Sequence, residues 1–355
     1  MIASAEQKHL LDRIAPLLAR LGRTRDEIED APVLLGRNLN ARLRFSDGDD
    51  VFVKAVRGLG AAGRYQRVTT FHDVMDLTGL PLRTPDLLAR DDAGLVLAQT
   101  VVDAESTFAE RVRESTVSSE ELELVAGALA AVHGATPSDA SRVENRPPSL
   151  PPHGLDAMPI DLFEGSTMGQ LEMWRLLQGD PVLRDRLDAL VRSAPSGDDA
   201  SPIHGDLRSD QILLDGATCW MLDWEDFRLG DPARDVGGLL GELFYHRARR
   251  LVHSIVAEGE EVTDASIIAH GGRMVDEAVP SLRTFWRAYT RARAVEEGFA
   301  ARAVGFLGWQ LFDRALASAT YYGRMSAMDR ALAGIGREAI VNATGYTDVL
   351  GLGAE

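Results

Sequence analysis

The sequence has little of what marks secreted, zinc-scaffolded or membrane-spanning proteins. Its 355 residues include one cysteine, Cys219, which excludes an intrachain disulfide and any CxxC zinc-ligand spacing. No apolar run reaches the roughly 18 residues that a membrane-spanning helix needs. The N-terminal segment has a charged amphipathic pattern rather than that of a signal peptide. We therefore expect a cytoplasmic protein without a membrane partner.

Basic residues are scarce as well. The 38 Lys and Arg residues stand against 54 Asp and Glu residues, so the formal net charge is −16 and the pI is near 5.0. Nucleic-acid binding requires a cationic surface, and we accordingly expect no nucleic-acid partner. The negative charge would suit a cationic substrate, but it is more commonly a plain property of soluble proteins.

Hydrophobic patterning predicts a strand-rich N-terminal part. Helical spacing covers residues 4–29, and two strands over Val33–Phe45 and Asp50–Val56 are joined by a short polar turn. A helix follows around Ala61–Leu77. The stretch Leu87–Ala98 then has the pattern of a strand, a turn and a second strand.

Helical patterns dominate beyond Val102. The sequence predicts a capped helix over Ser118–His133, a Pro- and Ser-rich surface loop over 136–159 and helices over Gly169–Ser193. Two short strands follow at Gln211–Leu214 and Cys219–Leu222. The pattern from Val236 to Gly334 is that of nearly continuous helix. We predict an α+β protein with an N-lobe and its helical lead-in at 1–98, a hinge at 99–103 and a helical C-lobe at 104–355. A cleft between two such lobes is a common place for a ligand.

Two carboxylates are the main candidates for chemistry. Asp206, in the segment HGDLRSDQ, lies in a loop where a carboxylate can accept a proton from an attacking hydroxyl. Asp223 follows seventeen residues later at the end of an apolar strand, and the amide oxygen of Gln211 is a further ligand for a hard cation. Each motif alone is explained as a turn or a strand end. Their order and spacing favour magnesium and nucleotide binding, since Mg²⁺ needs only one or two carboxylates beside phosphate oxygens.

Lys54 is the charged residue of an otherwise apolar strand, VFVKAV. That placement costs free energy unless the ammonium reaches a partner, which in kinase-like folds is the α/β-phosphates of ATP; a half-exposed surface lysine is the alternative. The preceding loop, Leu35–Asn40, has a single glycine. Asn38, Asn40 and backbone N–H groups could bind phosphate there, and a plain turn explains the loop equally well.

Other polar residues are assigned supporting roles. The acid that would orient the lysine is sought in the following helix, where Asp73 and Asp76 are candidates, although a solvated helix face is the better explanation of both. His204 is expected to buttress its loop through hydrogen bonds. Asp231 and Asp235 are expected to form buried pairs that fix the magnesium loop.

These segments carry a family likeness. HGDL with Gln211, followed by LDWE and GDPARD, resembles the aminoglycoside phosphotransferase/choline kinase superfamily, whose pattern is HGDxxxxN followed by (I/L)DWE and GDPxxD. The helix Leu124–Gly134 is also similar to the corresponding helix of that superfamily. The resemblance implies a protein-kinase-like bilobal fold and an enzyme that uses ATP and Mg²⁺.

The resemblance also implies roles for single residues. Asp206 would be the catalytic base, Asp223 the principal magnesium ligand, and Lys54 the contact to the ATP phosphates. Gln99 and Val101 would lie in the hinge that binds adenine. Gln211 departs from the Asn of the superfamily by one methylene, which puts its secondary magnesium contact in question.

A narrower group shares this glutamine. HGDLRSDQ and LDWEDFRLGDPARDVG, with GRN near the start and VFVK in the second strand, are similar to the kinase subunit of class V lanthipeptide synthetases and its relatives in thioamitide pathways. That resemblance implies phosphorylation of Ser/Thr side chains in a ribosomally made precursor peptide. A separate partner lyase would then eliminate the phosphate.

Two further hypotheses use the same residues. A small-molecule kinase for an aminoglycoside, macrolide or amino-alcohol would use the same carboxylate pair, with acidic residues such as Glu258–Glu261 holding a cationic substrate. A pseudokinase scaffold is motivated by Gln211 and by the lack of a clear acid for Lys54. It predicts that Asp206→Asn leaves function unchanged.

Overall fold

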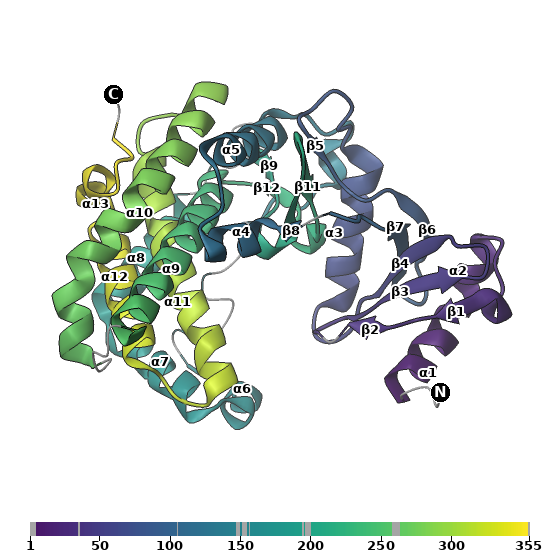
Figure 1. Cartoon of the computed structure of the whole chain (residues 1–355), viewed down its shortest axis with the longest axis horizontal. Helices are drawn as coiled ribbons and strands as arrows, with labels where there is room; N and C mark the ends of the chain where they lie inside the picture. Colours follow the sequence, from purple (N-terminus) through teal and green to yellow (C-terminus); the bar gives the residue numbers. More distant parts are fainter. Residues whose placement is uncertain are drawn as a thin grey trace.

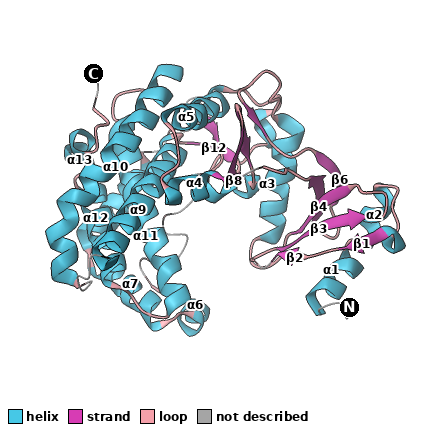
Figure 2. Cartoon of the chain, viewed as in Figure 1, coloured by secondary structure: helices cyan, strands magenta, loops and turns pink. Residues whose placement is uncertain are grey.

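The computed structural model describes residues 5–34, 36–104, 106–146, 150, 155, 157–193, 195, 200–257 and 263–353. A strand-rich lobe at the N-terminal end adjoins a larger helical lobe, and the two termini lie at opposite ends of the molecule (Figure 1). Strands occupy the smaller lobe and the junction, whereas the far part of the larger lobe is helical (Figure 2). Within the described residues, no helix is long and apolar enough to cross a bilayer.

One antiparallel sheet forms the smaller lobe. Its strands, in spatial order, are β1 (Ile28–Asp30), β3 (Leu39–Phe45), β4 (Asp50–Ala55), β7 (Val96–Thr100) and β6 (Leu87–Asp91), with β2 (Val33–Leu34) paired to β3. Alternate residues of β3 are buried, as the two-residue period of a strand requires. Helices α1 (Ala5–Arg13) and α2 (Ala15–Arg20) bury Leu10 and Leu17 in this lobe's core, together with Ile14 between them.

Helix α3 (Ala61–Val74) and strand β5 (Leu82–Arg83) join the lobes. Phe71 and Val74 of α3 belong to the core of the helical lobe. β5 pairs with β11 (Thr218–Met221) in a second sheet, which continues through β10 (Ile212–Asp215) to β8 (Ser106–Thr107). Residues from both sides of the boundary predicted at residue 98 therefore pack in the core of the helical lobe.

The helical lobe packs around one buried helix, α11, which contacts α7, α9, α12 and α13. Its helices are α4 (Phe108–Glu114), α5 (Ser119–Gly134), α6 (Ile160–Gly165), α7 (Met168–Gly179), α8 (Pro181–Arg192), α9 (Ala233–Ala257), α10 (Asp264–Ala292), α11 (Phe299–Tyr322), α12 (Ala327–Val341) and α13 (Ala343–Val349). At the crossing of α11 and α12, a Cβ on Gly308 would clash with the carbonyl of Gly336. The two backbones can thus approach closely only because both residues lack side chains.

Short elements place the site loops. β9 (Ser201–Ile203) pairs antiparallel with β12 (Arg228–Gly230), so the segments that lead into HGD and GDPARD run side by side. The 3₁₀ turns are η1 (Arg25–Glu27), η2 (Ala140–Arg142), η4 (Ser209–Gln211) and η5 (Trp224–Asp226). The strand predicted over Val33–Phe45 is interrupted between β2 and β3, and α3 ends three residues before the predicted Leu77. The acidic segment Glu258–Glu261 lies outside the described residues.

Candidate active site

The loop that carries Asp206 is fixed from below by the start of α9. The backbone N–H groups of His204 and Gly205 donate to the two carboxylate oxygens of Asp235, at 2.6 and 2.9 Å. Arg234 donates from Nε to the carbonyl of Gly205 at 2.6 Å. Gly205 has φ +85°, and a Cβ there would collide with the carbonyl of Asp226, so the turn requires glycine.

Asp235 belongs to a fully buried polar network. His133 Nε2 lies 3.2 Å from Asp235 Oδ2, and His133 Nδ1 lies 2.8 Å from the hydroxyl of Tyr289. Burial lowers the pKa of His133. A neutral His133 that donates to Asp235 and accepts from Tyr289 satisfies both groups. Burial opposes ionisation of Asp235, but His133 and the loop amides together hold the pKa of this carboxyl below its ordinary value.

His204 supports the same loop from within. Its ring is buried, its Nε2 lies 2.8 Å from the carbonyl of Leu222, and it packs against the indole of Trp224. Asp231 is nearly fully buried. It accepts from Ala233 N at 3.0 Å and from Arg302 Nε at 2.6 Å, which ties the start of α9 to α11. His204, Asp231 and Asp235, which were predicted to have supporting roles, thus lie beneath the loops that carry Asp206 and Asp223.

Asp206 itself faces outward. Its side chain keeps 48% of its surface exposed, and its nearest cation is Arg208, with Nη1 3.7 Å from Oδ2. The surrounding protein raises the pKa of Asp206; Arg208 opposes the shift, while the carboxylates of Asp226 and Asp313 add to it. A carboxylate that is accessible and more basic than usual suits acceptance of a proton from a hydroxyl.

Asp223 follows β11 in a left-handed conformation, with φ +69°. Its side chain is one third exposed, and Lys54 Nζ lies 2.5 Å from its Oδ1. Burial opposes ionisation here, but Lys54, His204 and Arg208 lower the pKa of Asp223. Of the two carboxylates, Asp223 therefore stays ionised to lower pH, as a cation ligand must.

Arg208 lies between acidic groups and was not singled out from the sequence. Burial works against its charge, but Asp210, Asp206 and Asp223 raise the pKa of its guanidinium. The signal was the basic residue two positions after Asp206 in HGDLR. An arginine beside both carboxylates is suited to meet phosphate oxygens.

The acid that orients Lys54 is not in α3. Lys54 is 6% exposed, and its Nζ lies 2.5 Å from Oε1 of Glu225 as well as 2.5 Å from Asp223. The candidates Asp73 and Asp76 were wrong. Asp73 pairs with two arginines on the outside of the lobe, and Asp76 accepts from the backbone of the turn after α3.

Asn38 also meets Glu225. Its side-chain amide donates to Glu225 Oε1, and its Oδ1 faces Arg57 N at 3.4 Å and Arg64 Nη2 at 3.5 Å. The side chain of Asn38 thus already braces the segment that carries Asp223 and Glu225, and its phosphate contact stays a prediction. Asn40 lies on β3 directly opposite Lys54. Its Oδ1 is buried and has no hydrogen-bond partner among the described residues.

Gln211 and Gln99, both predicted to be ligand-binding residues, make contacts to other protein groups. Gln211 Oε1 accepts from Arg208 N at 2.9 Å and closes η4, so this oxygen already serves the catalytic loop, and its metal contact stays a prediction. Gln99 lies inside β7, paired with both neighbouring strands, and its amide contacts His72 Nε2 at 3.2 Å. β7 ends at Thr100, so the irregular stretch between the lobes begins at Val101.

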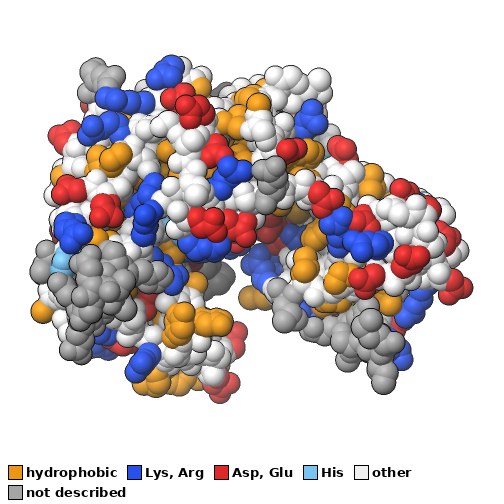
Figure 3. Space-filling model, in the orientation of Figure 1, with side chains coloured by type: hydrophobic (Ala, Val, Ile, Leu, Met, Phe, Trp, Pro, Cys, Tyr) orange, Lys and Arg blue, Asp and Glu red, His pale blue; other side chains and the backbone are white. Residues whose placement is uncertain are grey.

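The donor set fits a metal shared with a ligand. Among the described residues, no group of three or more His, Cys, Asp or Glu side chains could hold an ion by itself. Asp223, with Asp206 beyond Arg208, would need phosphate and water oxygens to complete the shell, which is how Mg²⁺ is usually bound. The space-filling view shows a hollow between the lobes, with acidic and basic side chains gathered where they meet (Figure 3).

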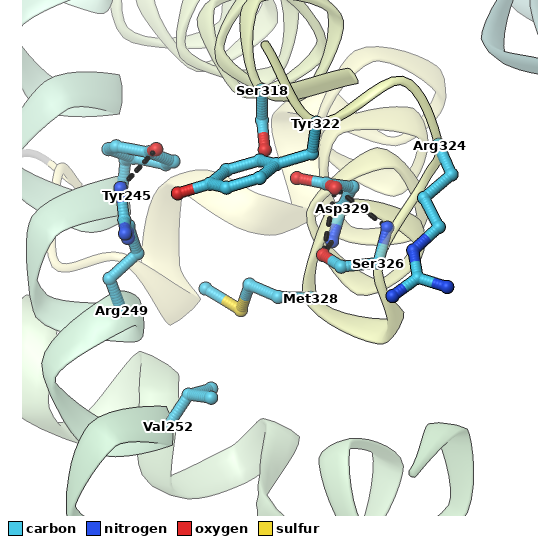
Figure 4. Close-up of a pocket in the computed structure, with 9 residues that line it drawn as sticks. All are labelled: Tyr245, Arg249, Val252, Ser318, Tyr322, Arg324, Ser326, Met328 and Asp329. Atoms are coloured by element: carbon cyan, nitrogen blue, oxygen red, sulfur yellow. Dashed lines mark hydrogen bonds between the residues drawn. The ribbon is translucent and has the colours of Figure 1, made fainter. Parts of the chain in front are cut away.

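Other cavities lie apart from these residues. One of about 300 Å³ opens between α9, α11 and the start of α12, where Tyr322 points toward Tyr245 above Met328 (Figure 4). A wider groove of about 930 Å³ runs between α10 and the C-terminal segment that includes Leu352. No residue of the candidate site lines either one.

Comparison with known proteins matches this arrangement. Residues 30–267, well over half of the chain, match the model of a family described as the phosphotransferase enzyme family. No curated protein sequence shows a significant match.

Solved structures show the same fold at low sequence identity. Choline kinase LicA from Streptococcus pneumoniae has a TM-score of 0.55 and 15% identity, over 96% of this chain and 100% of that chain. Plasmodium vivax ethanolamine kinase has a TM-score of 0.55 and 12% identity, over 96% and 89%. Amicoumacin kinase hAmiN, in complex with AMP-PNP, Ca²⁺ and Ami, has a TM-score of 0.54 and 12% identity, over 95% and 96%. The predicted α+β, protein-kinase-like bilobal fold is confirmed.

Proposed function

Because the chain belongs to the phosphotransferase enzyme family, we propose that it transfers the γ-phosphoryl group of ATP to a hydroxyl, with Mg²⁺ as the metal. The observation that carries the proposal is the pair of unlike carboxylates next to Arg208, of which Asp223 also contacts Lys54. The pKa of Asp206 is raised and that of Asp223 is lowered, so one suits proton acceptance and the other a cation.

Four residues have distinct roles in the proposed reaction. Asp206 accepts a hydrogen bond from the attacking hydroxyl, orients it and takes its proton as the new O–P bond forms, while the bond between the γ-phosphorus and the bridging oxygen breaks and ADP leaves with that oxygen. Lys54 and Arg208 place positive charge beside the phosphate oxygens, and Asp223 supplies the protein ligand for the ion. When bound, Mg²⁺ neutralises negative charge on the phosphates.

For the acceptor, we propose a Ser or Thr side chain of a ribosomally made precursor peptide, whose phosphate a separate lyase then eliminates. Support comes from HGDLRSDQ and LDWEDFRLGDPARDVG, which resemble the class V lanthipeptide kinase group. A second support is exposed apolar surface on the helical lobe: Ile160, Phe163, Met168 and Tyr321 are mostly exposed on α6, the start of α7 and the end of α11. Such a surface suits an extended peptide.

A small cationic acceptor is the second candidate. The carboxylates of Asp226 and Asp313 lie close enough to Asp206 to raise its pKa, and acidic groups around the base would attract an amine-bearing substrate. Three proteins of similar fold are kinases for choline, ethanolamine and amicoumacin.

A phosphorylation assay separates the two acceptors. The protein is incubated with ATP, Mg²⁺ and either a Ser/Thr-rich precursor peptide or a panel of aminoglycosides, choline and ethanolamine, and each product is analysed by mass spectrometry. We expect phosphate on Ser or Thr of the peptide, and none with Asp206→Asn. Phosphate on a small molecule and none on any peptide would replace the first candidate by the second. Unchanged pathway function with Asp206→Asn would instead identify a scaffold.

A further inference from the structure

Glu225 is a buried carboxylate on which three other segments converge. It is 2% exposed and lies on η5, two residues after Asp223. Its oxygens meet Lys54 of β4 at 2.5 Å, Arg64 of α3 at 3.0 Å and Arg37 of the loop before β3 at 2.9 Å, and they accept from the amide of Asn38. Among the described residues, three cations therefore share this one carboxylate. Arg37 and Lys54 belong to the smaller lobe and Arg64 to the joining helix α3, whereas Glu225 lies on η5, after β11.

Helix α3 faces this cluster with cations rather than acids. Arg64 is 5% exposed and forms an ion pair with Glu225. Its guanidinium also donates to the carbonyls of Leu59 at 2.6 Å and Arg57 at 2.5 Å. One turn later, Arg67 donates from Nε to the backbone carbonyl of Glu225 at 2.6 Å. In protein kinases the helix after the lysine strand supplies a glutamate to that lysine. An arginine cannot replace it, because a cation repels the ammonium, so α3 reaches Lys54 only through Glu225.

The two carboxylates on Lys54 differ in what else they can do. Asp223 keeps a third of its side-chain surface exposed, whereas that of Glu225 is 3% exposed and surrounded by other donors. A metal ion can thus reach Asp223, while Glu225 is committed to protein groups. An ion held by Asp223 would repel the ammonium, so Lys54 would need a second anchor to stay in place.

We propose that Glu225 is the positioning residue for Lys54. It retains the ammonium at the nucleotide phosphates while Asp223 exchanges Lys54 for the metal ion, and Arg64 holds Glu225 in place of an acid on α3. The inference rests on the proposed function, since it requires a nucleotide between the lobes. It adds that one carboxylate couples the loop before β3, strand β4, helix α3 and the metal loop.

A double-mutant cycle on nucleotide affinity tests this role. Dissociation constants of the magnesium nucleotide are measured by calorimetry for wild type, Glu225→Gln, Lys54→Met and the double variant. Each single change is expected to weaken binding by about tenfold, the scale of one lost charge-assisted contact. If Glu225 acts through Lys54, the double variant binds no more weakly than Lys54→Met. Losses that simply multiply, or wild-type affinity for Glu225→Gln, would overturn the proposal.

Asp73→Asn is the matched control, because it removes a carboxylate of α3 that also pairs with arginines. It is expected to bind the nucleotide like wild type. A loss of affinity equal to that of Glu225→Gln would show that Glu225 is not the specific partner of Lys54. Where Glu225→Gln does not fold, Glu225→Asp retains the charge on a shorter side chain. In the wild-type background, Glu225→Asp should lower the affinity for the nucleotide several-fold. In the Lys54→Met background it should cause no further loss, and equal losses in both backgrounds would contradict the proposal. Failure of the wild type to bind ATP would refute the proposed function itself, which keeps the two outcomes distinct.

Discussion

The two sides of the site are held in different ways. Around Asp206, the loop is fixed by Asp235, Arg234 and His133, which all belong to the helical lobe. Around Lys54, the contacts to Glu225 and Asp223 cross from one lobe to the other. The catalytic side therefore keeps its geometry if the lobes shift, whereas the nucleotide side exists only while they are together. In the proposed reaction, the side around Asp206, which binds the acceptor, is thus preorganised. The side around Lys54, which binds the phosphate donor, is assembled when the lobes come together.

Removal of the base should give the largest effect and leave both supports intact. Asp206→Asn is expected to lower kcat by about 10³-fold, within the range for a lost general base. Because the side chain is half exposed and makes no contact to the other lobe, thermal stability and nucleotide affinity should stay at wild-type values. Steady-state kinetics with calorimetry checks both. Retention of more than a tenth of the activity would show that another group takes the proton.

Removal of the support under the catalytic loop should cost stability. Asp235→Ala leaves the amides of His204 and Gly205 and the ring of His133 without their acceptor, and breaking a buried polar network of this kind costs about 3 kcal/mol. Urea unfolding followed by circular dichroism gives the change in free energy. Glu172→Ala removes a carboxylate from an exposed 3.9 Å pair with Arg330 and serves as the control, with an expected change below about 0.5 kcal/mol. Equal losses of unfolding free energy in the two variants would show that the buried network around Asp235 is no more stabilising than an exposed ion pair.

A weaker junction should affect the nucleotide side alone. Arg67 joins α3 to the metal loop through Glu225 and Asp226. Arg67→Met is therefore expected to raise the KM for ATP by up to about tenfold, since one charge-assisted contact is lost, with kcat nearly unchanged. Arg142→Met, which removes an exposed arginine from Asp73, is the control. A fall in kcat at constant KM would mean that the junction also aligns the catalytic loop.

The smallest expected effect is a pH dependence of folding. Burial beside β7 lowers the pKa of His72 to about 4, whereas the unfolded chain binds this proton near pH 6.5. The contribution of neutral His72 is thus fully present above pH 6.5 and is lost as the pH falls toward 4. His72→Gln should reduce the loss of unfolding free energy between pH 7 and 5 by roughly 1 kcal/mol. His9→Gln, at an exposed histidine, is the control, and identical slopes in the two variants would show that His72 is not buried neutral.

Local signals made much of the fold predictable. The β3–β4 hairpin follows from alternating burial, and α5 starts directly after Ser118 because Ser118 and Glu121 form a capping box. The β9–β12 pair could not be predicted, since three-residue strands carry no periodic pattern and their pairing depends on contacts distant in sequence.

The site divides in the same manner. Asp206, Asp223 and Lys54 lie in short motifs whose residue types and order indicate phosphotransfer, and the structure brings Lys54 and Asp223 together. Glu225 was missed because the acid was sought in α3, as the kinase pattern suggests. The overlooked signal was negative: near its start, α3 carries Arg64 and Arg67, and its acid, Asp73, comes only near its end.

The left-handed backbone of Asp223 limits which residues can occupy that position, whatever their chemistry. Asparagine and glycine adopt such angles readily, but alanine there costs on the order of 1 kcal/mol and a β-branched residue more. Natural drift away from catalysis would thus pass most easily through asparagine, which keeps the turn and removes only the charge. For the same reason Asp223→Asn is the variant with which to test the metal ligand, because a loss of activity would then report on the missing charge and not on a distorted loop.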